Sequence, residues 1–383
     1  MRNVSLLAVS SIALLIGCSE QQSLPSGLTP SRPSFVTYNA SAGAPTILGA
    51  WNGSPYTIAY DINDLGTISG VSDASSIKAV GWATGIGPAP KSTSPFVIGA
   101  GGIGRAINSV GQVAGEYITH AGLWTPVPKS STYTLTDIGN DALFTGASSS
   151  AAFGMNASGQ VVGMYTVPGV LGNVTKCFLW TPNSTNGTTG SAVEVPGLGG
   201  EFCVANDINS SGQVAGASTL SGGGPNHAFV WKVGLPTDLQ PGGDESYGAA
   251  INNAGQVAGY HTGATGPTSA AVWTPSGTSW GSVVDLLPPS LSGQSAIINS
   301  AAMDINDAGY VVGYTRDVAN VERAFFWQGT AFTELSDAGV PSVLATALTN
   351  VTAGNRVIVT GAALINTTST DRHGLRWSVA LKR

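Results

Sequence analysis

At residues 62–66 the chain reads Ile-Asn-Asp-Leu-Gly, and turns of this Asn-x-x-Gly form return at intervals along the sequence. In such a turn the asparagine side-chain oxygen accepts backbone hydrogen bonds, and the glycine adopts the left-handed conformation that other residues avoid. Successive turns are 43 to 54 residues apart, which is typical of a chain built from stacked copies of one unit. The turn asparagines are Asn63, Asn108, Asn156, Asn209, Asn252, Asn306 and, in a degraded last copy with one inserted residue, Asn350.

A tryptophan follows each turn asparagine by 16 to 27 residues and gives the repeat a second landmark. Each unit reads as four short strands: one that ends at the turn, one that follows it, one that carries the tryptophan, and an apolar strand after a loop. The tryptophans are Trp82, Trp124, Trp180, Trp231, Trp273, Trp327 and Trp377. The units are expected near residues 59–103, 104–150, 151–203, 204–247, 248–300, 301–344 and 345–378.

Seven units of four strands favour an all-β fold, a seven-bladed β-propeller with four-stranded blades. Blades that pack face to face cover both sides of most strands. This agrees with a content of charged residues of only 9% and with strands that read as apolar runs. A right-handed β-solenoid is the competing architecture, although its coils are usually shorter and vary less in length.

The two ends of the repeat array indicate how the ring closes. The last unit stops soon after Trp377 without a fourth strand, whereas residues 45–49 read as a fourth strand with no unit of their own. Pairing of this N-terminal strand with the last blade would remove an exposed sheet edge. We therefore expect one propeller domain over residues 45–383, preceded by a flexible Ser-, Pro- and Gln-rich tether over residues 19–44.

Residues 1–18 have the features of a targeting segment. Arg2 precedes an apolar core over residues 4–16, which is too short to span a membrane, and the segment ends in Leu15-Ile16-Gly17-Cys18. This tetrapeptide resembles the bacterial lipobox, whose cysteine is lipidated and becomes the new N-terminus, so Cys18 is the predicted lipidation site. A plain signal peptide is the alternative. Ser19 after the cysteine suggests, by analogy with enteric bacteria, sorting to the outer membrane, with the anchored domain facing either the periplasm or the medium.

The cysteines indicate the cellular compartment of the protein, and its net charge limits the classes of partner that it can bind. Cys177 and Cys203 would lie in an oxidising compartment, where we expect a disulfide between them, with two buried free thiols as the alternative. The net charge is −6 and no basic patch is present, which argues against a nucleic-acid partner. We expect a monomer that contacts the membrane through its N-terminal lipid.

One segment resembles a known family. His227-Ala228-Phe229-Val230-Trp231 and the upstream residues 205–216, which read ANDINSSGQVAG, are similar to the signature of the bacterial extracellular HAF repeats. The resemblance covers roughly residues 45–378, with departures in the first and last units. The resemblance implies a location outside the cytoplasm. It does not imply an established activity, a cofactor or a catalytic residue.

Three aspartates share one repeat position, two residues before the turn asparagine: Asp61, Asp207 and Asp304. The first strand of a propeller blade is the innermost, so we expect these carboxylates near the axial channel. There they either bind a cation or polar ligand or accept hydrogen bonds from backbone N–H groups of their own or the next blade. Two copies also resemble half a calcium-binding loop, but the closing glutamate is missing, and we expect no metal site.

Aromatic and histidine positions supply the remaining candidates. Trp51 and Trp280 lie outside the tryptophan series, on predicted loops, and are candidates for an exposed binding face, with local packing as the alternative. His120, His227 and His373 begin the tryptophan strand in three units, and we expect each to bond a neighbouring backbone group.

The sequence predicts a cell-envelope binding scaffold for a protein or glycan partner. Loops of variable length on a repeated framework are typical of proteins that present loops to a partner. No catalytic constellation stands out at a defensible spacing, and we expect no cofactor. The alternatives are an extracellular polysaccharide hydrolase or lyase on a propeller scaffold and a purely structural envelope component.

Overall fold

The computed structural model describes residues 40–381, apart from 74–75, 171, 241–244, 263–266, 277–278, 287–295, 330, 336, 338, 341 and 365–370, and apart from the side chains of 279–282. These residues form mainly β-strands, with short 3-10 helices η1 (Trp51–Gly53), η2 (Ile138–Asn140) and η3 (Ala142–Phe144). The expected all-β fold is confirmed. No helix in this described part has the length and apolarity that crossing a membrane requires.

We number the repeat units 1 to 7 in chain order. Within each unit, successive strands pair antiparallel. Unit 1 forms a four-stranded sheet of β3 (Tyr56–Ile62), β4 (Thr67–Asp73), β5 (Ile77–Ala83) and β6 (Pro95–Ala100). Unit 2 forms a separate four-stranded sheet of β7 (Gly102–Ile107), β8 (Val113–Tyr117), β9 (His120–Pro126) and β10 (Tyr133–Asp137). Units 3 and 4 share one sheet, β11 (Ser149–Met155), β12 (Val161–Pro168), β13 (Asn173–Pro182), β14 (Gly190–Val195), β15 (Gly199–Ile208), β16 (Val214–Leu220), β17 (Asn226–Trp231) and β18 (Thr237–Asp238).

Units 5 and 6 also share an eight-stranded sheet, β19 (Ser246–Ile251), β20 (Val257–Thr262), β21 (Thr268–Ser276), β22 (Ser279–Leu286), β23 (Ile297–Ile305), β24 (Val311–Asp317), β25 (Glu322–Gln328) and β26 (Ala331–Glu334). In both shared sheets the two units meet at a parallel bridge, Thr175 with Phe202 and Thr268 with Asn299. Unit 7 consists of β27 (Ser342–Leu348), β28 (Arg356–Leu364) and β29 (Arg372–Ala380).

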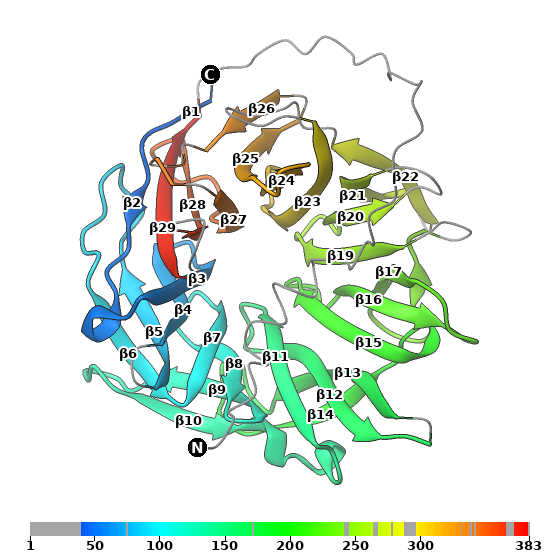
Figure 1. Cartoon of the computed structure of the whole chain (residues 1–383). Helices are drawn as coiled ribbons and strands as arrows, with labels where there is room; N and C mark the ends of the chain where they lie inside the picture. Colours follow the sequence, from blue (N-terminus) through cyan, green and yellow to red (C-terminus); the bar gives the residue numbers. More distant parts are fainter. Residues whose placement is uncertain are drawn as a thin grey trace, which may run out of the picture. The chain divides into compact units, whose positions relative to one another are not determined.

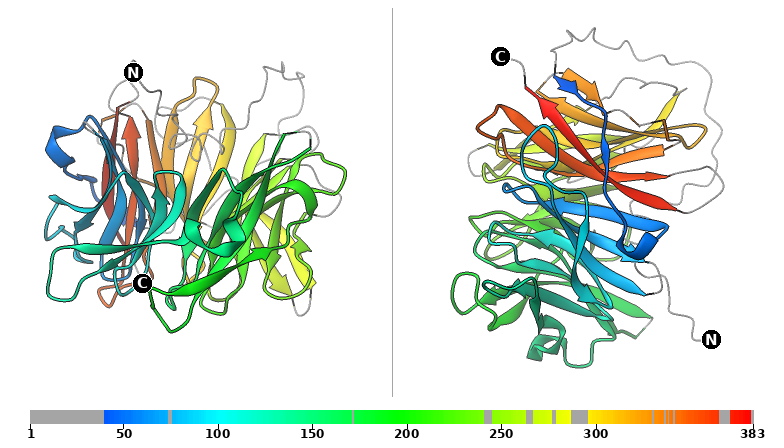
Figure 2. Two further views of the ribbon diagram at one scale, coloured as in Figure 1. Left: turned by 90° about the horizontal axis from the view of Figure 1, so that it is seen from below. Right: turned by 90° about the vertical axis from the view of Figure 1, so that its left-hand side faces the viewer.

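The N-terminal segment completes the sheet of unit 7. Two short strands, β1 (Ser41–Ala42) and β2 (Thr46–Ile47), pair antiparallel with β29, with Ser41 opposite Ala380 and Thr46 opposite Arg376 (Figure 2). The expected pairing of residues 45–49 with the last unit is therefore present. The sheet also begins earlier than expected, because β1 lies within the segment that we assigned to the tether.

The first strands of the units surround a common axis. Each first strand contacts the first strand of the next unit, and β27 contacts β3, so the series returns to its start (Figure 1). Hydrogen bonds join the last unit to the first at this seam, from Gly374 N to Thr57 Oγ1 (3.1 Å) and from Thr346 Oγ1 to the Ala59 carbonyl (2.9 Å). Residues 40–381 therefore form a closed β-propeller.

The turn asparagine links neighbouring units as well as closing its own turn. In unit 4, Asn209 Oδ1 accepts from the N–H groups of Ser211 (3.1 Å) and Gln213 (3.0 Å), and Gly212 has a φ of +78°. Its Nδ2 donates to the carbonyl of Asn252, the same position in the next unit (3.0 Å). The equivalent bond occurs at Asn63–Asn108, Asn156–Asn209, Asn252–Asn306 and Asn306–Thr349.

Two units depart from this pattern. In unit 2, Asn108 Nδ2 donates to the side-chain oxygen of Asn186, which comes from a loop of unit 3 (3.0 Å). In unit 7, our assignment of Asn350 as the turn asparagine is wrong by one residue. Thr349 occupies that position, because its carbonyl accepts the bond from Asn306 and its N–H donates to the Ile358 carbonyl.

The tryptophan series and the disulfide hold the units together from the core. Trp82, Trp273 and Trp377 are fully buried, and Trp124 and Trp180 are nearly so, whereas Trp231 and Trp327 are half-buried. Cys177 on β13 and Cys203 on β15 form a disulfide, with their Cα atoms 5.2 Å apart. This bridge joins unit 3 to unit 4 covalently.

We predict that Asn209→Ala lowers the free energy of unfolding by about 2–4 kcal/mol, since it removes both hydrogen bonds of the turn cap and the buried bond to the Asn252 carbonyl. Guanidinium denaturation followed by tryptophan fluorescence measures this change. The control is Asn183→Ala, which removes an exposed side-chain bond to Thr189 and is expected to cost less than about 0.5 kcal/mol. Equal effects of the two substitutions would contradict the role of the turn amide.

Candidate functional site at the axial mouth

Every first strand carries a β-bulge at the same place, three residues before the turn position. The extra residue in each strand is unpaired in the ladder, and a bulge of this kind turns its side chain in a new direction. These bulge residues are Tyr60, Arg105, Phe153, Asn206, Ala249, Met303 and Thr346. They differ in size and polarity from unit to unit, so the symmetry of the repeat is broken next to the axis.

The bulge residues of units 1 to 3 pack on one another. The guanidinium carbon of Arg105 lies 5.2 Å from the centroids of both the Tyr60 and the Phe153 rings, which is a cation–π arrangement. Arg105 also binds Glu116 on β8 through Nε (2.8 Å) and Nη2 (2.6 Å). Because this buried cation is paired and stacked, it is held rigidly on one side of the axis.

The three candidate aspartates lie one residue beyond the bulges, and each carboxylate joins two units. Asp61 accepts from Ile62 N (2.7 Å) and from Ile107 N of the next unit (2.8 Å). Asp207 bonds Ile208 N and Ile251 N in the same way, and Asp304 bonds Ile305 N and Leu348 N. Of the two roles considered from the sequence, the observed contacts match hydrogen bonding to the backbone of their own and the next unit.

Burial perturbs these carboxyl groups. It raises the pKa of Asp61 and that of Asp207 from 3.8 to about 6, although the backbone hydrogen bonds act in the opposite direction. The pKa of Asp304 is raised well above its ordinary value, first by burial and then by the negative charge of Asp61. The negative charge of Asp61 also raises the pKa of Asp207, so Asp61 acts on both of the other carboxyl groups.

The residue directly after each turn position forms a rim at this end of the axis; the turn position is an asparagine in units 1 to 6 and Thr349 in unit 7. The rim consists of Asp64, Ser109, Ala157, Ser210, Asn253, Asp307 and Asn350. Its side chains are linked in sequence around one side: Ser210 N donates to Asn253 Oδ1 (2.9 Å), Asn253 N to Asp307 Oδ1 (2.9 Å), and Asp307 N to Asn350 Oδ1 (2.9 Å). Asn350 N then donates to Asp64 Oδ1 (2.8 Å), which connects the last unit to the first.

The rim surrounds a cavity of about 230 Å³, which we call the axial mouth. Residues from all of the repeat units line it, including the turn asparagines, the apolar residues before them and Asp207. Its charged lining residues are the aspartates Asp64, Asp207 and Asp307, and no lysine or arginine is among the lining side chains. The axial mouth therefore suits a neutral or cationic group that forms hydrogen bonds.

The rim as a whole was not among the sites that we expected from the sequence. A polar residue follows the asparagine in most copies, and this recurrence was the available signal. Among the residues that the structure describes, no group of three or more His, Cys, Asp or Glu side chains is arranged to hold a metal ion.

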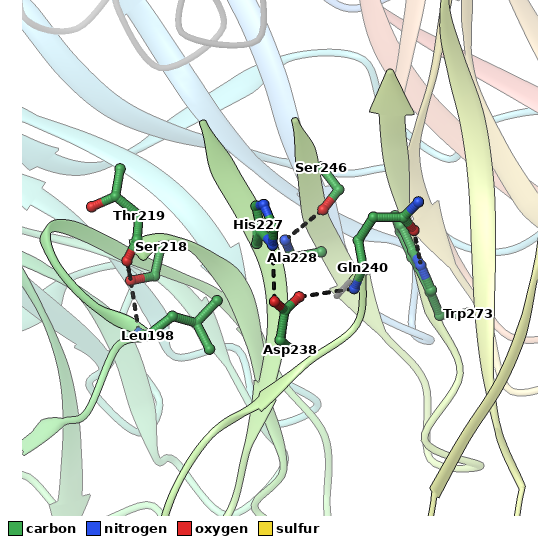
Figure 3. Close-up of polar contacts among 9 residues, drawn as sticks. All are labelled: Leu198, Ser218, Thr219, His227, Ala228, Asp238, Gln240, Ser246 and Trp273. Atoms are coloured by element: carbon green, nitrogen blue, oxygen red, sulfur yellow. Dashed lines mark hydrogen bonds and ion pairs between the residues drawn. The ribbon is translucent and has the colours of Figure 1, made fainter. Parts of the chain in front are cut away.

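The histidines at the start of the third strand have hydrogen-bond partners that differ from the ones we expected. His227 Nδ1 lies 2.9 Å from the Asp238 carboxylate (Figure 3). His120 Nδ1 lies 3.0 Å from the Asp137 carboxylate. For His120 and His227 the expectation of a backbone partner was wrong, because the partner is an acid on the fourth strand. Other units place Lys176 against Glu194 (2.9 Å) and Arg323 against Asp337 (3.4 Å). Basic side chains at this position thus tie the third strand to residues of the outer edge.

The other candidate residues do not join the axial mouth. Trp51 lies in η1, is half-buried and packs against the core beside Leu48, so local packing accounts for it. The backbone of Trp280 lies on β22, and its side chain is outside the described residues. Cys18 and the targeting segment are also outside the described residues.

No protein-family model matches the chain, and no curated protein is significantly similar to it. Among solved structures, it is similar to the acylaminoacyl peptidase of Pyrococcus horikoshii, with a TM-score of 0.51 and 12% identity over 86% of this chain and 52% of the peptidase. It also resembles the β-propeller domain of the trilobed protease from Pyrococcus furiosus, with a TM-score of 0.47 and 11% identity over 91% and 97% of the two chains. The chain spans about half the length of the first of these enzymes, and the likeness concerns the fold alone.

We predict that the protein loses stability as the pH rises from about 4 to about 6. The folded state holds the Asp61 and Asp207 protons up to a pKa of about 6, whereas the unfolded chain releases them near 3.8. The folded state therefore binds more protons between these values, and its free energy of unfolding falls as they ionise. Denaturation curves measured across this pH range test the slope.

Asp61→Asn is expected to flatten this slope, whatever its effect on absolute stability, because the substituted side chain does not titrate. Asp73→Asn, which changes an exposed carboxylate of the same unit, serves as the control and should leave the slope unaltered. An unchanged slope in Asp61→Asn would show that the carboxyl group is not perturbed by burial.

Proposed function

We propose that this protein is a lipid-anchored binding module of the cell envelope. Its axial mouth would take up a neutral or cationic hydrogen-bonding group carried by a protein or glycan partner. The observation that carries the proposal is the rim, where six polar side chains from different units converge on one cavity. A few polar groups fixed around a concavity are what a specific binding site requires.

The rim also has the rigidity that selective binding needs. Rim side chains accept hydrogen bonds from the main-chain N–H of the preceding rim residue, and the turn asparagines beneath them are buried and bonded to the next unit. Groups held in advance lose little conformational entropy when a ligand binds. The acidic lining supports a partner group without negative charge, because a carboxylate or phosphate would be repelled.

We infer that the ring counts seven blades and belongs with the bacterial extracellular HAF repeats. The seven bulged first strands and the cycle of contacts among them support this count, even though neighbouring units share sheets in two places. The HAF-like segment at residues 227–231 and the lipobox-like segment that ends at Cys18 support a location in the cell envelope, at the outer membrane. The protein would then act as a monomer on a lipid tether.

A hydrolase or lyase that acts on extracellular polysaccharide is the second candidate. The observation that favours it is a pair of rim carboxylates: Asp64 Oδ2 and Asp307 Oδ2 both accept from Asn350 Nδ2, at 3.2 and 3.3 Å. Two carboxylates near one cavity are the minimum for general acid–base cleavage of a glycosidic bond. In that case Asp64→Asn and Asp307→Asn would each abolish release of reducing sugar from envelope polysaccharide, whereas a binding module would release none.

We predict that Ala157→Trp blocks binding at the axial mouth. Ala157 is an exposed rim residue, so the indole would fill the opening without removing a rim hydrogen bond. Retention of the partner from envelope extract, or of glycans on an array, should fall at least about tenfold, because a filled cavity cannot accept a ligand group.

The matched control is Val170→Trp, the same substitution at a fully exposed residue beyond the opposite end of β12. It should retain the partner as the unchanged protein does. Full retention by Ala157→Trp would contradict a role for the axial mouth.

The lipid anchor makes a separate prediction. Cys18→Ser should abolish incorporation of labelled palmitate and release the protein from the membrane fraction, because a hydroxyl does not replace the thiol as the acceptor. Ser19→Ala, which keeps the thiol, should still be labelled. Continued labelling of Cys18→Ser would refute lipidation at this residue.

A further inference from the structure

A second cavity lies between units 5 and 6, away from the axis. It has a volume of about 360 Å³, within the range of about 300–1,000 Å³ that ligand pockets occupy. Unit 5 contributes Gln256, Val272 and Thr274 to its lining, and unit 6 contributes Tyr310, Trp327 and Gln328. We call it the lateral cavity.

Trp327 distinguishes the lateral cavity from the equivalent places elsewhere in the ring. Most tryptophans of the series are buried, and several use the indole N–H within the protein, as Trp82 does with the Gly49 carbonyl (2.8 Å) and Trp273 with Gln240 (3.3 Å). Trp327 is half-buried, lines the cavity, and its Nε1 has no hydrogen-bond partner among the described residues. The face of the Trp327 indole and its N–H donor are therefore both available to a ligand in the lateral cavity.

The polar atoms of the lateral cavity are arranged around this ring. Gln328 Nε2 donates to the Tyr310 hydroxyl oxygen (3.1 Å), which leaves the Tyr310 O–H as a donor. Within the described part of the chain, the Gln328 side-chain oxygen has no donor bonded to it. Gln256 is fixed by Asn252 (2.9 Å) and approaches Thr274 Oγ1 (3.4 Å).

None of the described residues that line the lateral cavity is charged. An ionic ligand would therefore lose its hydration without gaining an opposite charge, which is unfavourable. A ligand with an apolar face and uncharged hydroxyl groups at its edge matches the lining, because the apolar face covers the indole and the hydroxyls bond the amide and phenol groups. Neutral pyranose sugars have this combination.

We propose that the lateral cavity is a binding site for a neutral pyranose, which stacks on Trp327 and bonds Gln328 and Tyr310. This site is independent of the axial mouth. It uses a different set of side chains, so either site can be lost while the other remains.

The test is saturation-transfer NMR on the full chain with the neutral methyl glycosides of glucose, galactose, mannose and N-acetylglucosamine. A detergent without a sugar headgroup keeps the lipidated protein in solution and leaves the site free. At least one glycoside should bind, with saturation strongest on the ring protons that face the indole. Trp327→Ala should weaken its binding at least about tenfold, since the stacking surface is lost.

Trp231→Ala is the matched control, because Trp231 is equally half-buried but its indole N–H is bonded to the Gly234 carbonyl (3.0 Å). It should bind the glycoside like the unchanged protein. If Trp327→Ala does not fold, Gln328→Ala replaces it and should weaken binding by about three- to tenfold through loss of one or two hydrogen bonds.

Three results would overturn the proposal: no glycoside binding at tens of millimolar, equal loss in Trp231→Ala, or unchanged binding in the folded variant of the lateral cavity. Loss of glycoside binding in Ala157→Trp alone would also overturn it, by assigning the sugar to the axial mouth. If Ala157→Trp leaves partner binding unchanged while the lateral cavity still binds sugar, the result contradicts the proposed function only.

Discussion

The ring depends on one short contact, the hydrogen bond from the side-chain amide of a turn asparagine to the main-chain carbonyl at the same position of the next unit. Both partners are buried, and each has a second partner in its own unit: Asn209 Nδ2 also donates to Gln213 Oε1 (2.9 Å), and the Asn252 carbonyl also accepts from Gly255 N (3.0 Å). The same asparagine closes its own turn through its oxygen. In five units a single side chain thus sets the local turn and contacts the neighbouring unit, whereas Asn108 of unit 2 bonds Asn186 instead.

The functional features lie where the repeat is imperfect. The asparagine turns are nearly uniform, whereas the bulge residues and the rim residues on either side of them vary in charge, size and polarity. A uniform framework places these variable side chains at fixed points around the axis. The axial mouth is acidic, and the interior beyond it holds a stacked arginine on one side. The two layers therefore have different chemistry although they are only a few residues apart in sequence.

Much of the architecture was predictable, because it depends on local rules. The turn, its glycine and the four-strand pattern are set by neighbouring residues, and the orphan strand before unit 1 followed from the missing strand after Trp377. The contacts of the turn amides between units were not predictable, since no neighbouring residue shows that the Asn209 amide reaches Asn252 or that the Asn186 side chain lies beside Asn108. For the same reason, our assignment of Asn350 as a turn residue was wrong by one position, and we chose Trp51 instead of Trp327 as a candidate binding residue. Burial and cavity shape are properties of packed units, and no single unit contains them.

The seam has a mechanical consequence. The covalent bridge ties unit 3 to unit 4, on a different part of the ring, whereas the N-terminal segment is held to β29 by two strands of only two residues each. A pulling force applied to the segment before Ser41 acts on β1 first and then on β2, so their few bonds break one after another instead of sharing the load. Tension applied there would detach these two strands from the edge of unit 7, whereas the packing of β3 on β27, β28 and β29 would still hold the last unit to the first.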